Sequence, residues 1–316
     1  MKIIIVGYGE MLKSVIDGVL DTDNEIVGIF RHENIMYSPF KKNLKDVFYP
    51  SYDYKFIKSK KLSEIKAKSV NSQEFITTVK ELKADLIITC SWSEKFSAQT
   101  INAPKIACIN VHPSLLPKYR GPNPYLQVIL NNESTTGITF HLMDINYDTG
   151  AILHQAKLPI LPEETGGGLR NRCAGLAKIE VKELLNNFQD KLRNQKSQVE
   201  KEATYFHNIS LADSILDFEK ETSEEIDRRI RALTPWVKCH IPYNKDFFDF
   251  KKYKILTEIS TKKPAIIAKK TKQSVSIVCK DGRIIQFFGL QPKRFIPRLF
   301  SNLYFNKIVK TNTRAI

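Results

Sequence analysis

INVHPSLLPKYRGPNPYLQVILNNESTTGITFHLMDINYDTG, residues 109–150, contains apolar, strand-like segments separated by loops rich in glycine and proline. Three polar residues, Asn110, His112 and Asp148, lie at the edges of these segments. Polar side chains that follow strands and precede shaped loops are typical of functional sites, because loops on a rigid scaffold carry most binding and catalytic groups. The stretch therefore indicates an active site built on a sheet.

The chain that precedes this stretch alternates between two kinds of segment. Strands are predicted at residues 2–6, 25–30, 85–90 and 105–111, and helices at residues 11–20 and 72–82. Strands that alternate with helices imply an α/β domain with a parallel sheet. Ligands of such sheets bind beyond the carboxyl ends of the strands, where residues 91–96 (SWSEKF) and 112–120 fall.

Two stretches of this first domain are less regular. Residues 31–68 are aromatic, basic and poorly periodic, which predicts a long surface loop with short pieces of structure. The opening GYGEML, residues 7–12, lacks the third glycine of a GxGxxG motif. It therefore reads as a tight turn into a helix, and only weakly as a dinucleotide site.

Further elements follow along the chain, with a helix predicted at residues 124–130, strands at 137–142 and 151–156, and a helical region at 163–193. We predict a catalytic domain over residues 1–193, a polar linker over 194–202 and a second domain over 203–316. Residues 222–233 carry a capping-box start, and short β-type runs follow from residue 255. Short strands favour a smaller OB-like β-barrel, although a half-barrel or a sandwich also fits.

The net charge of +15 is concentrated at the C-terminal end. Residues 238–316 contain 18 Lys and Arg against 4 Asp and Glu, a local charge of 18 − 4 = +14. Such an excess indicates a polyanionic partner, with a solvated basic face as the alternative.

Other composition features narrow the class of protein. The five cysteines (Cys90, Cys108, Cys173, Cys239 and Cys279) are scattered without metal-binding spacing, so we expect buried thiols and no metal site. No run approaches the roughly 18 apolar residues of a membrane span, and the N-terminus lacks a secretory signal pattern. We expect a cytoplasmic protein without a membrane span.

The residue types in the opening stretch suit acyl-group chemistry. Asn110 and His112 are two positions apart at a strand end, so their side chains leave the same face and can reach one carbonyl oxygen. An amide donor and an imidazole can stabilise negative charge on that oxygen or move a proton, and Asp148 could orient the imidazole or hold a relaying water. No GxSxG elbow is present, which argues against a covalent intermediate. Alternatively, His112 is a histidine bonded to backbone and Asp148 makes an Asx turn.

Two segments resemble a known family. NVHPSLLPKYRG at residues 110–121 and TTGITFHLMDINYDTG at residues 135–150 closely resemble the formyltransferases that use 10-formyltetrahydrofolate. The resemblance implies the formyltransferase fold, with a Rossmann-like, mostly parallel sheet, and gives catalytic roles to Asn110, His112 and Asp148. It also implies direct attack of an amine on the formyl carbon, with tetrahydrofolate as the leaving group.

The same resemblance implies a folate pocket formed by three segments. They are the 91–96 loop with Ser91, Trp92 and Phe96, the backbone of Ser114, Leu115, Leu116 and Pro117, and the 143–148 loop with Met143, Asp144 and Tyr147.

The acceptor amine is a separate question, because family members share the catalytic domain. Residues 203–236 resemble the start of the C-terminal domain of the members that act on initiator methionyl-tRNA, and the basic segment fits a phosphate backbone. However, GYGEML, SWSEKF and residues 31–68 depart from the pattern of those members. An amino-sugar nucleotide is therefore the alternative acceptor.

A non-enzymatic protein that binds RNA or a membrane surface is the third possibility. Residues 295–310 (FIPRLFSNLYFNKIVK) mix aromatic and basic side chains, which could stack on bases or lie on anionic lipid. The alternative is that they form the last element of the second domain.

Overall fold

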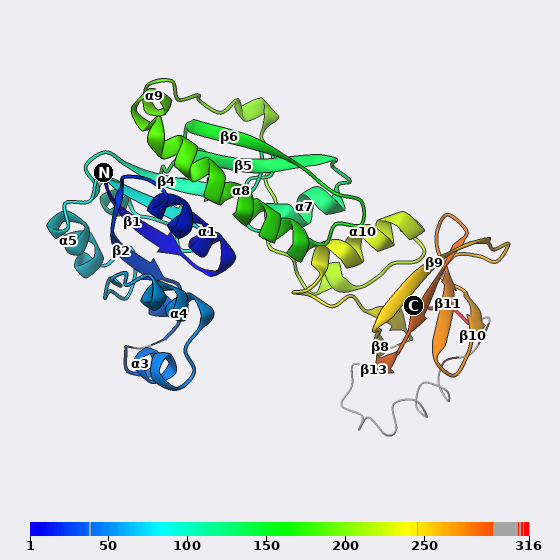
Figure 1. Cartoon of the computed structure of the whole chain (residues 1–316). Helices are drawn as coiled ribbons and strands as arrows, with labels where there is room; N and C mark the ends of the chain where they lie inside the picture. The colour runs from blue at the N-terminus through cyan, green and yellow to red at the C-terminus, as the bar shows by residue number, and fades with distance from the viewer. Residues whose placement is uncertain (38, 245, 293–308, 310, 312, 316) are drawn as a thin grey trace. The chain divides into compact units, whose positions relative to one another are not determined.

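The structure is a computed structural model that describes residues 1–37, 39–244, 246–292, 309, 311 and 313–315 (Figure 1). It divides into two compact units. The first contains Met1–Val128, Glu133–Leu161 and Gly168–Asn208, and the second contains Ile129–Asn132, Pro162–Gly167 and Ile209–Ile316. Residues 194–202, the expected linker, belong to the first unit, and the domain boundaries at residues 193 and 203 stay a prediction.

A six-stranded sheet with the order β2-β1-β3-β4-β5-β6 forms the centre of the first unit. Its strands are β1 Lys2–Gly7, β2 Glu25–Arg31, β3 Leu86–Cys90, β4 Ala107–His112, β5 Thr135–Leu142 and β6 Ile152–Pro159. The pairs β1-β2, β1-β3 and β3-β4 are parallel, while β4-β5 and β5-β6 are antiparallel. The predicted mostly parallel α/β sheet is therefore confirmed.

Helices cover both faces of this sheet, because the alternating side chains of its buried strands are apolar on both sides. They are α1 Gly9–Leu20, α5 Gln73–Glu81, α6 Ala98–Ile101, α7 Pro124–Leu130, α8 Gly166–Asn186 and α9 Phe188–Arg193. Ile4 and Val6 of β1 pack in one apolar cluster with Phe75 of α5. On the other side α1 packs closely on α8, since a Cβ on Gly18 would lie 2.4 Å from the carbonyl oxygen of Lys178 (Figure 1).

The prediction of a long surface loop over residues 31–68 is wrong in its main part. Three helices occupy it, α2 Glu33–Met36, α3 Pro39–Phe48 and α4 Tyr52–Ser59. Among the residues of α3 whose burial is described, Asp46 is the buried one, whereas Phe40 and Val47 are 73% and 71% exposed. The helix therefore buries a charged side chain and exposes apolar ones. A helix is usually recognised in a sequence by an apolar stripe that faces the core, and this helix does not have that pattern.

Arg31, the last residue of β2, holds these helices to the sheet. Its side chain is fully buried, and its guanidinium lies 2.8 Å from Asp46, 3.0 Å from Glu64 and 3.4 Å from Glu33. Lys42 adds a second cation at 3.1 Å from both Asp46 and Glu64. Buried charges are tolerated only when they are paired in this way.

The described residues of the second unit form an antiparallel β module that includes the helix α10. Its strands are β7 Ile241–Tyr243, β8 Asp246–Asp249, β9 Lys252–Ile259, β10 Ile267–Lys270, β11 Ser274–Val278, β12 Arg283–Phe288 and β13 Gln291–Pro292. They form a sheet of order β10-β11-β12-β9 and a sheet of order β13-β8-β7. The second, smaller β domain is therefore confirmed, although the described strands make two sheets and no closed barrel.

Helix α10 Ser223–Leu233 has the predicted capping box, in which Thr222 and Glu225 exchange side-chain to backbone hydrogen bonds. Its Ile226 packs with Phe218 of the preceding turn and Phe287 of β12 in the core of the second unit. Residues 295–308 and 310 of the aromatic and basic tail lie outside the described residues.

Replacing Arg31 tests the ionic network. We expect Arg31→Met to lower the free energy of unfolding of the first unit by about 3–5 kcal/mol, because three carboxylates lose their buried cation. Urea unfolding followed by Trp92 fluorescence in a Trp236→Phe background measures this, since Trp92 lies 5.6 Å from the Phe30 ring within that unit.

The matched control is Arg193→Met, which removes an exposed pair with Asp190. That change should cost less than about 0.5 kcal/mol. Equal effects of the two substitutions would mean that the Arg31 network does not hold the helices.

Candidate active site

Strand pairing brings the predicted polar residues together at the end of β4. Asn110 lies opposite His141 of β5, and His112 lies opposite Thr139. Directly opposed residues in an antiparallel pair point to the same face and are in contact distance. His141 therefore joins the two residues named from the sequence, and the alternation of Thr139 and His141 along the expected strand was the signal that could have found it.

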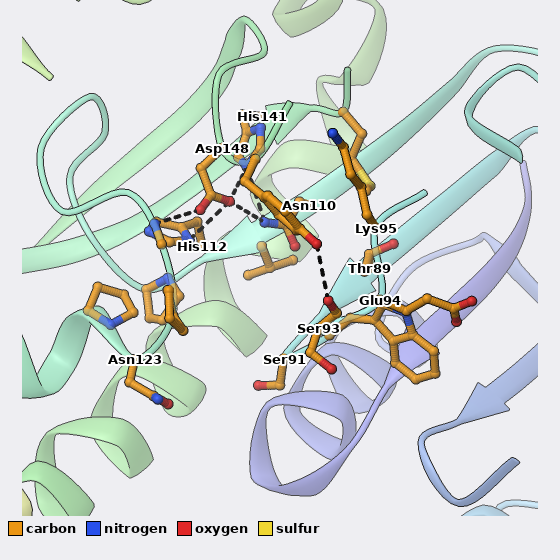
Figure 2. Close-up of a pocket in the computed structure, with 18 of the residues that line it drawn as sticks. Thr89, Ser91, Ser93, Glu94, Lys95, Asn110, His112, Asn123, His141 and Asp148 are labelled. Atoms are coloured by element: carbon orange, nitrogen blue, oxygen red, sulfur yellow. Dashed lines mark hydrogen bonds and ion pairs between the residues drawn. The ribbon is translucent and has the colours of Figure 1, made fainter. Parts of the chain in front are cut away.

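The carboxylate of Asp148 is the centre of the cluster (Figure 2). Its Oδ1 accepts a hydrogen bond of 3.2 Å from Asn110 Nδ2 and lies 3.4 Å from His112 Nδ1 and 3.6 Å from His141 Nε2. Its Oδ2 accepts a hydrogen bond of 2.9 Å from the backbone N–H of Gly121. The structure thus brings together all three predicted catalytic residues.

The loop that carries Asp148 is held in an unusual conformation. Asp148 has φ of 59°, in the left-handed region that few non-glycine residues adopt. Gln198 stabilises it, because its Nε2 donates to the carbonyl oxygens of Asp148 and Gly150, each at 2.8 Å. Residues expected to form a linker therefore support the site.

Hydrogen bonding fixes the protonation of His112. Its Nε2 lies 2.8 Å from the carbonyl oxygen of Tyr119, which can only accept, so Nε2 carries a hydrogen. Burial lowers the pKa of His112, and the neighbouring Asp148 carboxylate offsets this only in part. His112 Nδ1 faces the Asp148 carboxylate at 3.4 Å, so a proton received by Nδ1 would lie between the two groups and be stabilised by the carboxylate.

Asp148 is ionised at neutral pH. Burial favours its neutral form, but the positive charge that His112 carries once protonated and the Gly121 N–H hold its pKa below its usual range. The two roles predicted for His112, a hydrogen bond to backbone and a part in catalysis, are compatible. Its Nε2 bonds the backbone of Tyr119, while its Nδ1 faces the Asp148 carboxylate.

A cavity of about 420 Å³ opens over this cluster and is lined by Asn110, His112, His141 and Asp148. This volume lies in the usual range for small-molecule sites. The cavity is also lined by the predicted residues Ser91, Trp92, Phe96, Met143, Asp144 and Tyr147. The sequence did not indicate other residues of the cavity wall, among them Tyr8, Asn123, Tyr125, Tyr205, His207 and Asn208.

Residues 114–117 do not line this cavity among the described residues. Ser114 is fully buried and donates to the carbonyl oxygen of Lys118, and Leu116 packs at 3% exposure. Leu115 lies beside Gly137, and Pro117 follows a cis peptide bond. The folate contacts of Ser114, Leu115, Leu116 and Pro117 stay a prediction.

The thiols and the first glycine turn offer no second site. All five cysteines are free and buried, and burial raises the pKa of Cys108 to about 12, so it is a poor nucleophile. At the start of α1, the backbone N–H of Gly9 donates to Asp53 at 2.8 Å. Within the described ranges, no cluster of His, Cys, Asp or Glu could hold a metal ion and no helix is apolar and long enough to cross a membrane.

Comparison with known proteins agrees with the sheet and the cluster. The chain belongs to the formyl transferase family, whose formyl transferase model matches residues 1–185 and whose C-terminal domain model matches residues 208–295. The protein is a formyltransferase.

Named relatives include two methionyl-tRNA formyltransferases. That of Enterococcus faecalis is 34% identical over 212 residues, 67% of each chain. That of Clostridioides difficile is 27% identical over 293 residues, 90% of each chain. Among solved structures, WlaRD, a sugar 3N-formyltransferase crystallised in the presence of dTDP and 5-N-formyltetrahydrofolate, has a TM-score of 0.63 at 21% identity over 94% of this chain and 99% of its own.

The protonation of His112 can be measured directly. We expect the imidazole Cε1–H NMR signal of His112 to titrate with a midpoint below pH 6.5, because burial lowers its pKa from that value. Asp148→Asn should move the midpoint lower still, since it removes the charge that favours the imidazolium. Because the unfolded chain binds this proton more tightly, the folded state should lose stability as pH falls below about 6.5.

Asp144→Asn is the control, because this carboxylate of the same loop bonds Thr149 instead. It should leave the His112 midpoint nearly unchanged. A midpoint above 6.5 in the unsubstituted protein would mean that the Asp148 charge outweighs burial.

Proposed function

We propose that this protein transfers the formyl group of 10-formyltetrahydrofolate to an amine, and that the amine is the α-amino group of initiator methionyl-tRNA. The main support for this reaction is the position of the Asp148 carboxylate. It is buried at the cavity wall, where it accepts a hydrogen bond from Asn110 and faces His112. The carboxylate and the neutral imidazole together can receive the proton that an attacking amine must lose.

The cavity fits a folate co-substrate. Trp92, Phe96 and Met143 supply apolar contact for a flat ring system, and the volume of about 420 Å³ suits it. WlaRD, crystallised with 5-N-formyltetrahydrofolate, adds support for this class of donor.

In the proposed reaction the unprotonated amine attacks the formyl carbon, and a carbon–nitrogen bond forms as the formyl oxygen becomes an oxyanion. Asn110 donates to that oxyanion in exchange for its hydrogen bond to Asp148, while its Nδ2 keeps the hydrogen bond to His141. The amine proton passes to the His112 and Asp148 pair. The bond from the formyl carbon to folate N10 then breaks, and N10 takes up a proton.

The second unit supports a tRNA acceptor. Its exposed lysines for which the described part of the chain shows no ion pair include Lys238, Lys251, Lys252, Lys254, Lys263, Lys269, Lys272 and Lys280. Unpaired surface cations gain affinity for a phosphate backbone by releasing its counterions. The relatives named methionyl-tRNA formyltransferase add support, one of them over 90% of the chain.

An amino-sugar nucleotide is the second candidate acceptor. The likeness to WlaRD extends over 94% of this chain and therefore includes the second unit. A basic β module alone does not distinguish the two acceptors.

Substitution of the cluster tests the reaction. His112→Ala or Asp148→Asn should lower formyl transfer by at least about 100-fold, because each removes a group that handles the proton. Formylated product is quantified by mass spectrometry, with thermal melting as the control for folding. Undiminished turnover in both folded variants would contradict the proposed reaction.

A competition of acceptors tests the substrate. With 10-formyltetrahydrofolate supplied, we expect formylation of charged initiator tRNA, and binding of that tRNA should weaken steeply as salt rises. Lys252→Gln with Lys254→Gln should reduce the salt slope by about 1 for each phosphate that is no longer neutralised. The control is Lys178→Gln in the first unit, where Asp21 neutralises the lysine. Formylation of an amino-sugar nucleotide alone would replace tRNA as the acceptor.

A further inference from the structure

His141 is a buried polar residue of the cavity wall with no role in the reaction described above. Its side chain is 2% exposed, and its ring lies between Asn110 and the end of β5 (Figure 2). A buried imidazole on a strand is costly unless both ring nitrogens have partners. Both do, and the identity of those partners determines what His141 can do.

The tautomer of His141 follows from one contact. Its Nδ1 lies 2.8 Å from the carbonyl oxygen of Leu142, an atom that can only accept, so Nδ1 carries the hydrogen. In the neutral ring, Nε2 then presents a lone pair. Asn110 Nδ2, at 3.1 Å, is closer to this lone pair than the Asp148 oxygen at 3.6 Å, so Nε2 accepts from Asn110.

Two acceptors therefore fix the amide of Asn110. One hydrogen of Nδ2 goes to His141 Nε2 and the other to Asp148 Oδ1. A rotation of the amide by 180° would put its oxygen against a carboxylate and a lone pair, which is unfavourable at both contacts. His141 and Asp148 together keep the nitrogen of Asn110 directed toward the reacting groups.

We propose that His141 is a positioning residue for formyl transfer, which accepts a hydrogen bond from Asn110 and so keeps its amide nitrogen available to the oxyanion. This inference rests on the proposed function, because it needs the role given there to Asn110. Misdirection of a catalytic amide affects the transition state more than the binding of substrate.

Two substitutions at this position distinguish positioning from packing. His141→Phe fills similar space without an acceptor, and we expect kcat to fall about 100-fold, as for loss of one oxyanion donor, with KM for both substrates within about threefold. His141→Gln supplies a side-chain oxygen near the place of Nε2 and should recover at least about tenfold of that loss.

The matched control is His154→Gln. His154 lies on β6 and bonds Glu180 at 2.6 Å, and it is not among the residues that line the cavity. Its kcat should stay within about twofold of the unsubstituted value. Full kcat in folded His141→Phe, or equal loss in the Phe and Gln variants, would overturn the proposal.

A measurement on the unsubstituted protein applies even if His141→Phe does not fold. Nitrogen-15 NMR of the histidine rings reports the tautomer, and we expect His141 to carry its hydrogen on Nδ1 with Nε2 as an acceptor. A hydrogen on Nε2 would overturn the inference. Failure of the proposed function is distinct, because His112→Ala and Asp148→Asn would then retain formyl transfer.

Discussion

The buried carboxylate of Asp148 is the constraint on which the arrangement of several segments of the first unit depends. Its two oxygens contact groups from β4, from β5 and from the turn at Gly121. An unpaired carboxylate at this depth would be strongly unfavourable, so β4 and the turn at Gly121 have to present their donors, Asn110 Nδ2 and the Gly121 N–H, for the loop to close. The loop reaches this position with Asp148 in a left-handed backbone conformation, and the hydrogen bond from Gln198 to the Asp148 carbonyl oxygen stabilises that conformation.

The sequence predicts the sheet and the three residues around that carboxylate because both depend on local patterns. Asn110 and His112 are two positions apart on one strand, and Asp148 stands in a loop that ends in glycine. His141 was not predicted because it lies inside an apolar strand, where a lone histidine reads as core. The alternation of Thr139 and His141 indicates a polar face on this strand, but the antiparallel pairing of β4 with β5, a contact between distant parts of the chain, is needed to show that this face meets Asn110.

Other features could not be predicted for different physical reasons. The helices between residues 33 and 59 bury ions and expose Phe40 and Val47, which reverses the usual apolar pattern. In the second unit, the strands were expected, but how antiparallel strands divide into sheets depends on long-range pairing. The part of the cavity wall at Tyr205 and His207 follows a stretch without periodicity, so no local signal connects it with the cavity.

The hydrogen bond from the Gly9 N–H to Asp53 marks a difference between this protein and dinucleotide-binding proteins with a similar sheet. The difference concerns what binds at the N-terminus of the first helix. In those proteins the N-terminus of the first helix receives a phosphate from outside. Here a carboxylate of the chain itself fills that position at 2.8 Å, and burial raises the pKa of Asp53. A carboxylate of the chain thus occupies the anion position of the architecture, which leaves binding to the cavity beside it, between the loop after β3 and the end of β4.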